Sequence, residues 1–148
     1  MAKFFSHRGC VTGPEPSFEN RVKFVEHALS LGHDVEIDIQ SHNDVLYYGH
    51  DEPLAPVKLE FVTQPGVFCH AKDLTALGKL LAVPGIHTFW HETDTVTMTN
   101  QGYLWCFPGV HPRTERSIWL DLHNKPVPQD LNGIYAVCGD HAAVIKRK

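Results

Sequence analysis

The stretch Asp34-Val35-Glu36-Ile37-Asp38-Ile39-Gln40 alternates strictly between polar and apolar side chains. This period of two predicts a β-strand with the three aliphatic residues on one face and Glu36 and Asp38 on the other. Two carboxylates that leave the same face of a strand repel each other unless a cation or a proton lies between them. The stretch therefore predicts either a solvated strand edge or a cation site.

Strand-like and helix-like segments alternate on both sides of this strand. The preceding chain predicts a strand over 3–8 and a helix from an N-cap at Ser17 to about Leu31. The following chain predicts strands over 45–48 and 67–72, and then a helix that begins after an N-cap at Asp73 and ends at about Leu81. This order implies parallel pairing with right-handed crossovers.

The second half of the chain is rich in strands and poor in helices. The predicted strands cover 86–91, 95–98, 103–107, 117–122 and 134–137, and a last helical turn or two falls within 141–148. The chain has 148 residues, of which 43% are hydrophobic and 20% charged. These values predict a single α/β domain over 1–148.

Two imidazoles and a guanidinium follow directly after predicted strands. His7 and Arg8 close the first strand, and His50 follows the strand over 45–48. Imidazole can donate or accept a proton near neutral pH, so His7 and His50 are acid/base candidates. The planar fork of Arg8 matches two oxygens of a phosphate group. Together with Glu36 and Asp38, these groups suit a metal-assisted attack on a phosphate ester.

Four short motifs also stand in the order found in the glycerophosphodiester phosphodiesterase family. Ser6-His7-Arg8-Gly9, Ser17-Phe18-Glu19-Asn20, Glu36-Ile37-Asp38 and His50-Asp51 resemble the HRG, PEN, E-x-D and HD motifs of that family. The resemblance implies a TIM-barrel-like (β/α) phosphodiesterase fold. Such barrels typically need about 250 residues, so we expect a reduced or incomplete barrel with few outer helices.

The resemblance also implies roles for particular residues. His7, His50 and Arg8 are catalytic, and Glu36 and Asp38 ligate a divalent metal. Glu19 either orients Arg8 from behind or lies at the helix N-terminus because of the helix dipole alone.

The third metal ligand of the family is a glutamate that stands two residues before a lysine. This chain keeps the lysine as Lys72 but has His70 in place of the glutamate. Histidine retains a lone pair for a metal but removes a charge, which favours Mn²⁺, Zn²⁺ or Ni²⁺ over Ca²⁺. The alternative is that the third ligand has been lost, and the residues alone leave both interpretations open.

The expected substrate is a small phosphodiester. Arg8 and Lys72 would bind its phosphate, and Trp105, in a stretch that resembles the late aromatic strand of the family, would line the alcohol side. The resemblance implies an enzyme, a metal-dependent phosphoric diester hydrolase that acts on a glycerophosphodiester-like substrate of lipid metabolism. The cofactor is one divalent metal ion, Mg²⁺ or Mn²⁺ first, with Ca²⁺ and Zn²⁺ as alternatives.

A non-catalytic function is the main alternative. A degenerate member of the family could bind phosphate esters or assemble with partners, and the short chain and His70 favour this interpretation. The retention of His7, Arg8, Glu36, Asp38 and His50 argues against it, because a scaffold does not need that combination.

A barrel with few outer helices would expose apolar strand faces. Such faces invite a partner, so the sequence predicts a homo-oligomer that buries them between subunits.

Other classes of function are disfavoured by charge and composition. The formal net charge of −4 argues against a sequence-independent nucleic-acid binder. No apolar run is long enough for a signal peptide or a membrane span. The four cysteines have no C-x-x-C spacing, which favours free thiols and a cytoplasmic location.

Overall fold

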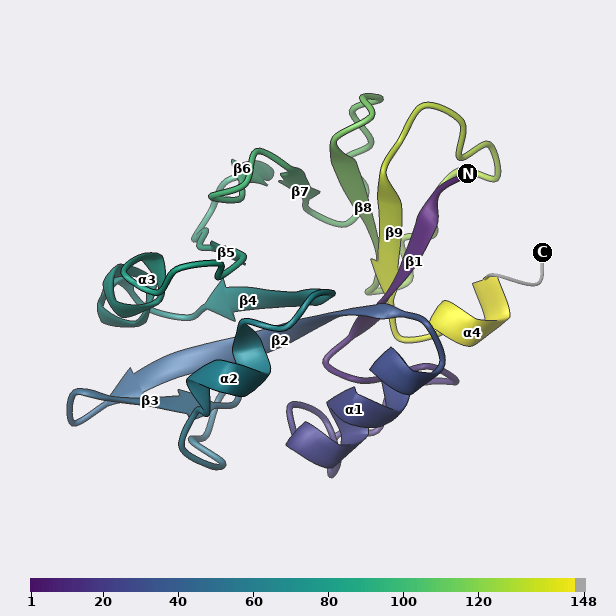
Figure 1. Cartoon of the computed structure of the whole chain (residues 1–148). Coiled ribbons are helices and arrows are strands. Elements are labelled where there is room, and N and C mark those ends of the chain that lie inside the picture. Colours follow the sequence, from purple (N-terminus) through teal and green to yellow (C-terminus); the bar gives the residue numbers. More distant parts are fainter. Residues whose placement is uncertain (146–148) are drawn as a thin grey trace.

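Nine strands form one sheet in the computed structural model, which describes residues 1–145 (Figure 1). They are β1 (Lys3–His7), β2 (Asp34–His42), β3 (Val45–Tyr48), β4 (Val67–Ala71), β5 (Thr88–Phe89), β6 (Val96–Met98), β7 (Leu104–Cys106), β8 (Ser117–Asp121) and β9 (Ala136–Gly139). Eight of them follow a barrel-like path in the order β5-β4-β2-β1-β9-β8-β7-β6, and β3 is an extra strand paired with β2. β1 pairs with both β2 and β9, so the two ends of the chain share this sheet.

The sheet nearly closes on itself. Strand pairs along the path are parallel except for β6 with β7. Asn100 bridges the remaining gap between β5 and β6. Its N–H donates to the carbonyl of Thr88 at 2.9 Å, and its side-chain oxygen accepts the N–H of Thr88 at 2.9 Å. The expected α/β barrel-like architecture is therefore confirmed at this level.

The alternation in β2 gives the strand two different buried faces. Val35, Ile37 and Ile39 are fully buried in a cluster with apolar residues of the helices. Glu36 and Asp38 point the other way, and they are 1% and 0% exposed. The predicted separation of apolar and acidic faces is confirmed, but both faces of β2 are buried, so the interpretation as a solvated edge is wrong.

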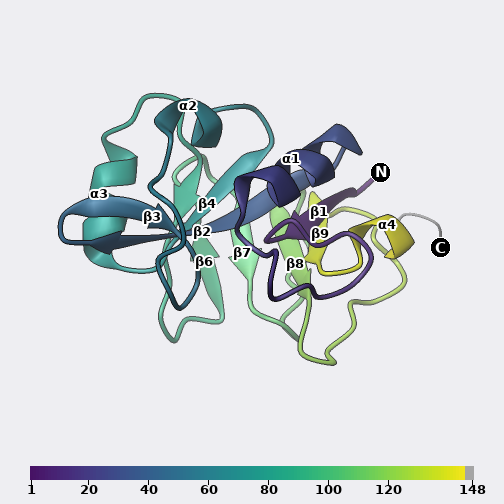
Figure 2. The same cartoon turned by 90° about the horizontal axis from the view of Figure 1, so that it is seen from below.

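Four short helices cover part of the sheet (Figures 1 and 2). They are α1 (Val22–Ser30), α2 (Leu59–Val62), α3 (Leu74–Leu81) and α4 (Ala142–Ile145). α1 packs on β2, α2 on β4, α3 on β2, β4 and β5, and α4 on β1. The sequence did not predict α2. The predicted last helical turn is present as α4, and residues 146–148 lie outside the described part of the chain.

The two predicted N-caps have different outcomes. Asp73 caps α3, because its Oδ1 accepts the N–H of Ala76 at 2.7 Å. The cap predicted at Ser17 is wrong, because α1 begins at Val22 after Arg21, whose side chain makes no cap hydrogen bond. The backbone of Asn20 has φ of 60°, which interrupts the helix pattern before its first turn.

The later strands are shorter than predicted or shifted. β5 covers only Thr88–Phe89 of the predicted 86–91, and β9 covers Ala136–Gly139, two residues after the predicted 134–137. Before β5, the carbonyl of His87 still accepts the N–H of Cys69 in β4 at 2.8 Å, whereas the carbonyl of Ile86 accepts the side chain of Asn100 instead of a strand partner.

Loops cover the outer face of β7, β8 and β9, where no described helix lies (Figure 1). Val127 and Leu131 pack against a buried cluster that contains Trp119 and Val137. The indole N–H of Trp119 donates to the carbonyl of Pro112 at 2.8 Å. The expectation of bare strand faces on this flank is therefore wrong, because two long loops replace the missing helices.

All four cysteines are buried and free, as the sequence predicted. No helix within residues 1–145 has the length and apolar character needed to cross a membrane.

Candidate functional site

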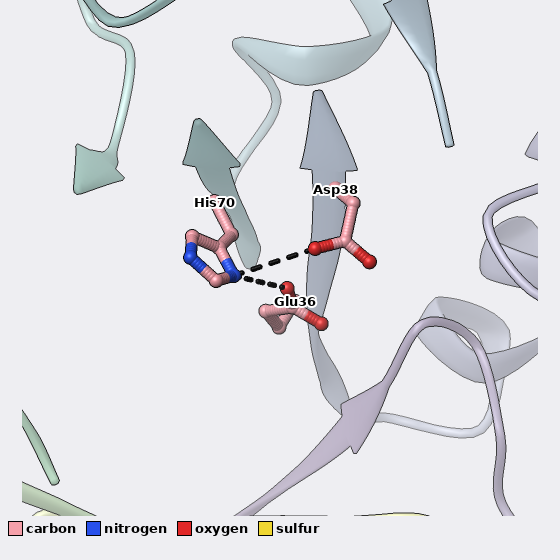
Figure 3. Close-up of side chains that lie close together, drawn as sticks. All are labelled: Glu36, Asp38 and His70. Carbon is pink, nitrogen blue, oxygen red and sulfur yellow. Dashed lines mark ion pairs between the residues drawn. The ribbon is translucent and has the colours of Figure 1, made fainter. Parts of the chain in front are cut away.

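The candidate site lies where β1 and β4 end on either side of β2, next to Glu36 and Asp38 within that strand. His7 of β1 is in register with Glu36 of β2, and Asp38 of β2 is in register with His70 of β4. Parallel strands end at the same mouth of a barrel, so these side chains gather there. Figure 3 shows Glu36, Asp38 and His70 converging from their two strands.

The three expected metal ligands form one cluster. His70 Nδ1 lies 3.4 Å from Glu36 Oε1 and 3.3 Å from Asp38 Oδ1 (Figure 3). One ligand atom of each residue lies within 4.8 Å of the others. Glu36 Oε2 and Asp38 Oδ1 are buried and have no hydrogen-bond partner. Buried carboxylate oxygens without partners are costly, so the donor set and its unsatisfied atoms fit a divalent cation.

Positive groups balance the buried charge of Asp38. Burial alone would raise the pKa of Asp38, but His70, Arg8 and Lys72 outweigh this effect and hold the pKa well below its usual range. Arg8 Nε lies 2.8 Å from Asp38 Oδ2, and Lys72 Nζ lies 3.8 Å from Asp38 Oδ1. Asp38 is therefore a carboxylate at neutral pH.

His70 carries a pKa that is shifted in the opposite sense to that of Asp38. Burial lowers the pKa of His70, but its contacts with Asp38 and Glu36 outweigh burial and raise the pKa above its ordinary value. A metal ion has to displace the proton that this raised pKa favours, so metal binding at His70 would release a proton.

Asn20 holds Asp38 from the side of the loop that follows β1. Its Nδ2 donates to Asp38 Oδ2 at 2.9 Å, and its Oδ1 accepts the backbone N–H of Asp38 at 2.8 Å. Sequence reasoning assigned no role to Asn20. The signal that could have identified Asn20 is its place in the motif Ser17-Phe18-Glu19-Asn20, directly after Glu19, which was given a role.

Glu19 contacts Arg8, as one of the two interpretations of the sequence expected. Arg8 Nη1 donates to Glu19 Oε2 at 3.2 Å, while Arg8 Nε faces Asp38. Glu19 does not lie in the first turn of α1, which begins at Val22, so the helix-dipole interpretation is wrong.

Each acid/base candidate has a carboxylate on one ring nitrogen. His7 Nδ1 lies 2.7 Å from Asp140 Oδ1, and His50 Nδ1 lies 2.8 Å from Asp51 Oδ1. The free nitrogen of His7, Nε2, lies 3.8 Å from Glu36 Oε2. Burial lowers the pKa of His7, but the hydrogen bond to Asp140 and the charge of Glu36 raise it above its ordinary value.

Asp140 is a functional candidate that sequence reasoning missed. It stands three residues after the predicted strand over 134–137, and sequence reasoning assigned it no role. Its proximity to His7 comes from the pairing of β1 with β9, which joins residues more than 130 positions apart.

One cavity of about 170 Å³ connects the predicted residues. Those of the predicted set that line it are His7, Arg8, Glu36, His50, His70, Lys72 and Trp105. Asp38 and Glu19 lie behind this lining and contact it through Arg8. Three further polar residues, to which the sequence assigned no catalytic, metal-binding or substrate-binding role, also line it: His91, Asp94 and His123.

Aromatic rings pack beside the metal-binding cluster. The ring of His70 is stacked with those of Phe89 and His91, with centroids 4.7 Å and 4.8 Å away. Phe89 in turn stacks on Trp105 at 4.5 Å. These contacts restrict rotation of the His70 ring, so its Nδ1 keeps its direction toward the two carboxylates.

His91 differs from His70 in its protonation. Burial, followed by the positive groups His70 and Lys72, lowers the pKa of His91 to about 4. His91 is therefore a neutral ring at neutral pH.

Comparisons with protein-family models, curated proteins and solved structures found no match to this chain. The resemblance to the glycerophosphodiester phosphodiesterase family therefore rests on the four motifs and on the residues that they place round this cavity.

Proposed function

We propose that this protein is a metal-dependent phosphodiester hydrolase. The observation that carries the proposal is the buried cluster of Glu36, Asp38 and His70, which opens on a cavity that also contains both imidazoles of His7 and His50. The motif resemblance adds a glycerophosphodiester-like substrate and a reduced TIM-barrel fold. The position of the cavity at the carboxyl ends of parallel strands agrees with that fold.

Glu36, Asp38 and His70 would hold one divalent ion, with Mg²⁺ or Mn²⁺ as the first candidates. Two carboxylates and one imidazole are a donor set that these ions and Zn²⁺ accept. When bound, the ion would stabilise negative charge on the phosphoryl oxygens.

Arg8 and Lys72 would bind and orient the phosphate group. Both line the cavity, and both carry a positive charge that Asp38 holds in place from behind. Arg8 can bind two phosphate oxygens through its fork, whereas Lys72 acts as a point charge.

His7 and His50 would move the protons. One imidazole takes a proton from a water molecule, whose oxygen forms a bond to phosphorus, while the ester P–O bond breaks. The other imidazole gives its proton to the departing alkoxide, so that a phosphomonoester and an alcohol result. Asp140 and Asp51 occupy the Nδ1 side of each ring, which leaves Nε2 for this exchange.

A non-catalytic phosphate-ester-binding or assembly module is the second candidate function. It is favoured by the ion pairs that Asp38 makes with Arg8 and Lys72, which balance part of the buried charge without a metal. The two functions differ in the role of His7 and His50. A hydrolase needs both imidazoles for turnover, whereas a binding module needs them for ligand binding at most.

Metal binding and turnover of purified variants test the proposal. Mn²⁺ binding is measured by electron paramagnetic resonance, and hydrolysis is measured on glycerophosphocholine and on methyl p-nitrophenyl phosphate. We expect Glu36→Gln to lose metal and turnover together. His7→Ala and His50→Ala should keep the metal but lose about 10²–10⁴ in rate, the usual contribution of a proton-transfer group.

Exposed residues supply matched controls for these variants. Glu60→Gln on α2 and His27→Ala on α1 remove the same groups from solvent-exposed positions, so both should retain metal and rate. Absence of turnover by the wild type with Mg²⁺, Mn²⁺, Ca²⁺ and Zn²⁺ would favour the non-catalytic module. Retention of Mn²⁺ affinity by Glu36→Gln would remove the metal site from the proposal.

A further inference from the structure

The cavity at the candidate site has two chemically different walls. Its charged wall comes from β2 and from the ends of β1 and β4 and carries Arg8, Glu36 and Lys72. The opposite wall comes from β7, β8 and the residues that follow them. It consists of five apolar residues and one polar residue: Trp105, Phe107, Pro108, Leu120, Leu122 and His123.

The second wall is built into the core of the barrel. Trp105 is 3% exposed, and Leu120 and Leu122 are each 8% exposed. All three belong to the apolar cluster that fills the barrel interior. Phe107 is different, because it is 43% exposed and lies after the end of β7.

Each of the two walls would contact a different part of a bound phosphodiester. If the phosphate lies against Arg8 and Lys72, a substituent that stays inside the cavity has to lie against the apolar wall. A polyol there would lose hydrogen bonds to water and face carbon atoms, which costs free energy for each hydroxyl group. An apolar substituent would instead gain by leaving water.

The size of the cavity limits that substituent. The volume of about 170 Å³ is smaller than the 300–1,000 Å³ typical of sites that enclose a drug-sized ligand. It leaves room for a phosphate and one compact group, so a second substituent on the phosphorus has to project out of the mouth.

We propose that the site selects phosphodiesters in which one substituent is compact and carbon-rich, such as an aryl or short alkyl group, and binds it on the Trp105–Leu122 wall. The inference rests on the proposed phosphate-binding role of the opposite wall. It differs from the glycerol substituent that the motif resemblance implies.

Binding of phosphomonoesters tests this selectivity without requiring turnover. Dissociation constants of phenyl phosphate, glycerol 1-phosphate and inorganic phosphate are measured by isothermal titration calorimetry on the Mn²⁺-supplemented protein. We expect phenyl phosphate to bind about tenfold or more tightly than glycerol 1-phosphate, because the ring buries apolar surface on the wall.

A variant at the exposed end of the wall locates the effect. Phe107→Ser should weaken phenyl phosphate severalfold and leave inorganic phosphate unchanged. Phe18→Ser is the matched control, because Phe18 is 55% exposed and does not line this cavity. It should change neither constant.

The outcomes separate this inference from the proposed function. Equal or tighter binding of glycerol 1-phosphate, or an unchanged phenyl phosphate constant in Phe107→Ser, would overturn the selectivity while the phosphate site stands. Failure of inorganic phosphate itself to bind would overturn the phosphate site and the selectivity together. A preference for phenyl phosphate in a protein without turnover would support the selectivity and count against catalysis.

Discussion

Asp38 is the residue on which most contacts of the site converge. It is held by Arg8 after β1, by Asn20 before α1, and by His70 and Lys72 at the end of β4, which are three different segments. The sequence predicted the direction of its side chain from the alternation of β2 alone. The contact with Asn20 could not be predicted in this way, because it depends on a loop residue with positive φ that tertiary structure places beside β2.

The carboxylate of Asp140 should matter for proton transfer by His7. In Asp140→Asn the hydrogen-bond partner keeps its size but loses its charge, so the pKa of His7 should fall. We expect the rate of hydrolysis to decrease at least about tenfold, since a carboxylate that orients a catalytic imidazole can contribute up to about 10⁴. Kinetics and the pH titration of His7 by nitrogen-15 NMR check this result.

The exposed Asp44 gives the control for that variant. Asp44→Asn removes a charge from a surface residue that forms an ion pair with Lys79. Unchanged kinetics in both variants would show that Asp140 does not act on His7.

His87 should make the stability of the fold depend on pH. Burial lowers the pKa of His87 to about 4, whereas an unfolded histidine titrates near 6.5. Between these values the unfolded chain binds the additional proton, so the contribution of His87 to the free energy of unfolding is present above about pH 6.5 and is lost as the pH falls toward 4.

Urea unfolding at pH 7 and pH 5 measures this contribution. His87→Gln removes the titrating group and retains a polar side chain near Thr99, which His87 contacts at 2.8 Å. The variant should lose less stability than the wild type between the two pH values. The comparison between proteins is necessary because His7 and His70, with raised pKa values, change stability in the opposite sense. Equal losses in both proteins would contradict the prediction.

At the level of elements, the first half of the chain was predictable except for α2 and the start of α1, because its signals are local. β1 to β4 and α3 follow from alternating or helical patterns and from the cap at Asp73. The start of α1 was not predictable from Ser17, because the chain first forms turns that place Glu19 and Asn20 against the site. The short β5 and the shifted β9 depend on pairing partners far away in the sequence.

The turn before α1 should contribute to stability through Asn20. Asn20→Ala removes both hydrogen bonds to Asp38 and leaves its buried carboxylate with one partner fewer. We expect a loss of about 1–3 kcal/mol in the free energy of unfolding, measured by chemical denaturation. Asn43→Ala is the control, because Asn43 also has positive φ but is exposed in a turn. A loss in Asn20→Ala no larger than that in Asn43→Ala would show that the bonds to Asp38 do not stabilise the fold.

At the level of the whole molecule, the barrel is asymmetric. Helices cover the flank formed by β1, β2, β4 and β5, whereas loops cover the flank formed by β7, β8 and β9 (Figures 1 and 2). The sequence predicted a reduced barrel with few helices, but it could not show that the segments over 108–116 and 123–133 pack on the strands. Loop packing of this kind depends on single contacts such as that between Trp119 and Pro112 rather than on a repeating pattern.

This loop packing bears on the state of assembly. The homo-oligomer predicted from the sequence depended on a bare strand flank, and Val127 and Leu131 pack on the buried residues of that flank. We therefore expect light scattering by the purified wild type to give the mass of a single chain, 16.7 kDa.

A double variant tests whether the loop prevents association. Val127→Asp with Leu131→Asp would place charges against the buried cluster that contains Trp119 and Val137, detach the loop and expose the apolar strands. It should associate or aggregate, because an uncovered apolar face promotes association. As a control, Leu74→Asp alters an exposed leucine on α3, 64% exposed, and should leave the mass unchanged. A stable wild-type oligomer would mean that another surface, and not this flank, joins the chains.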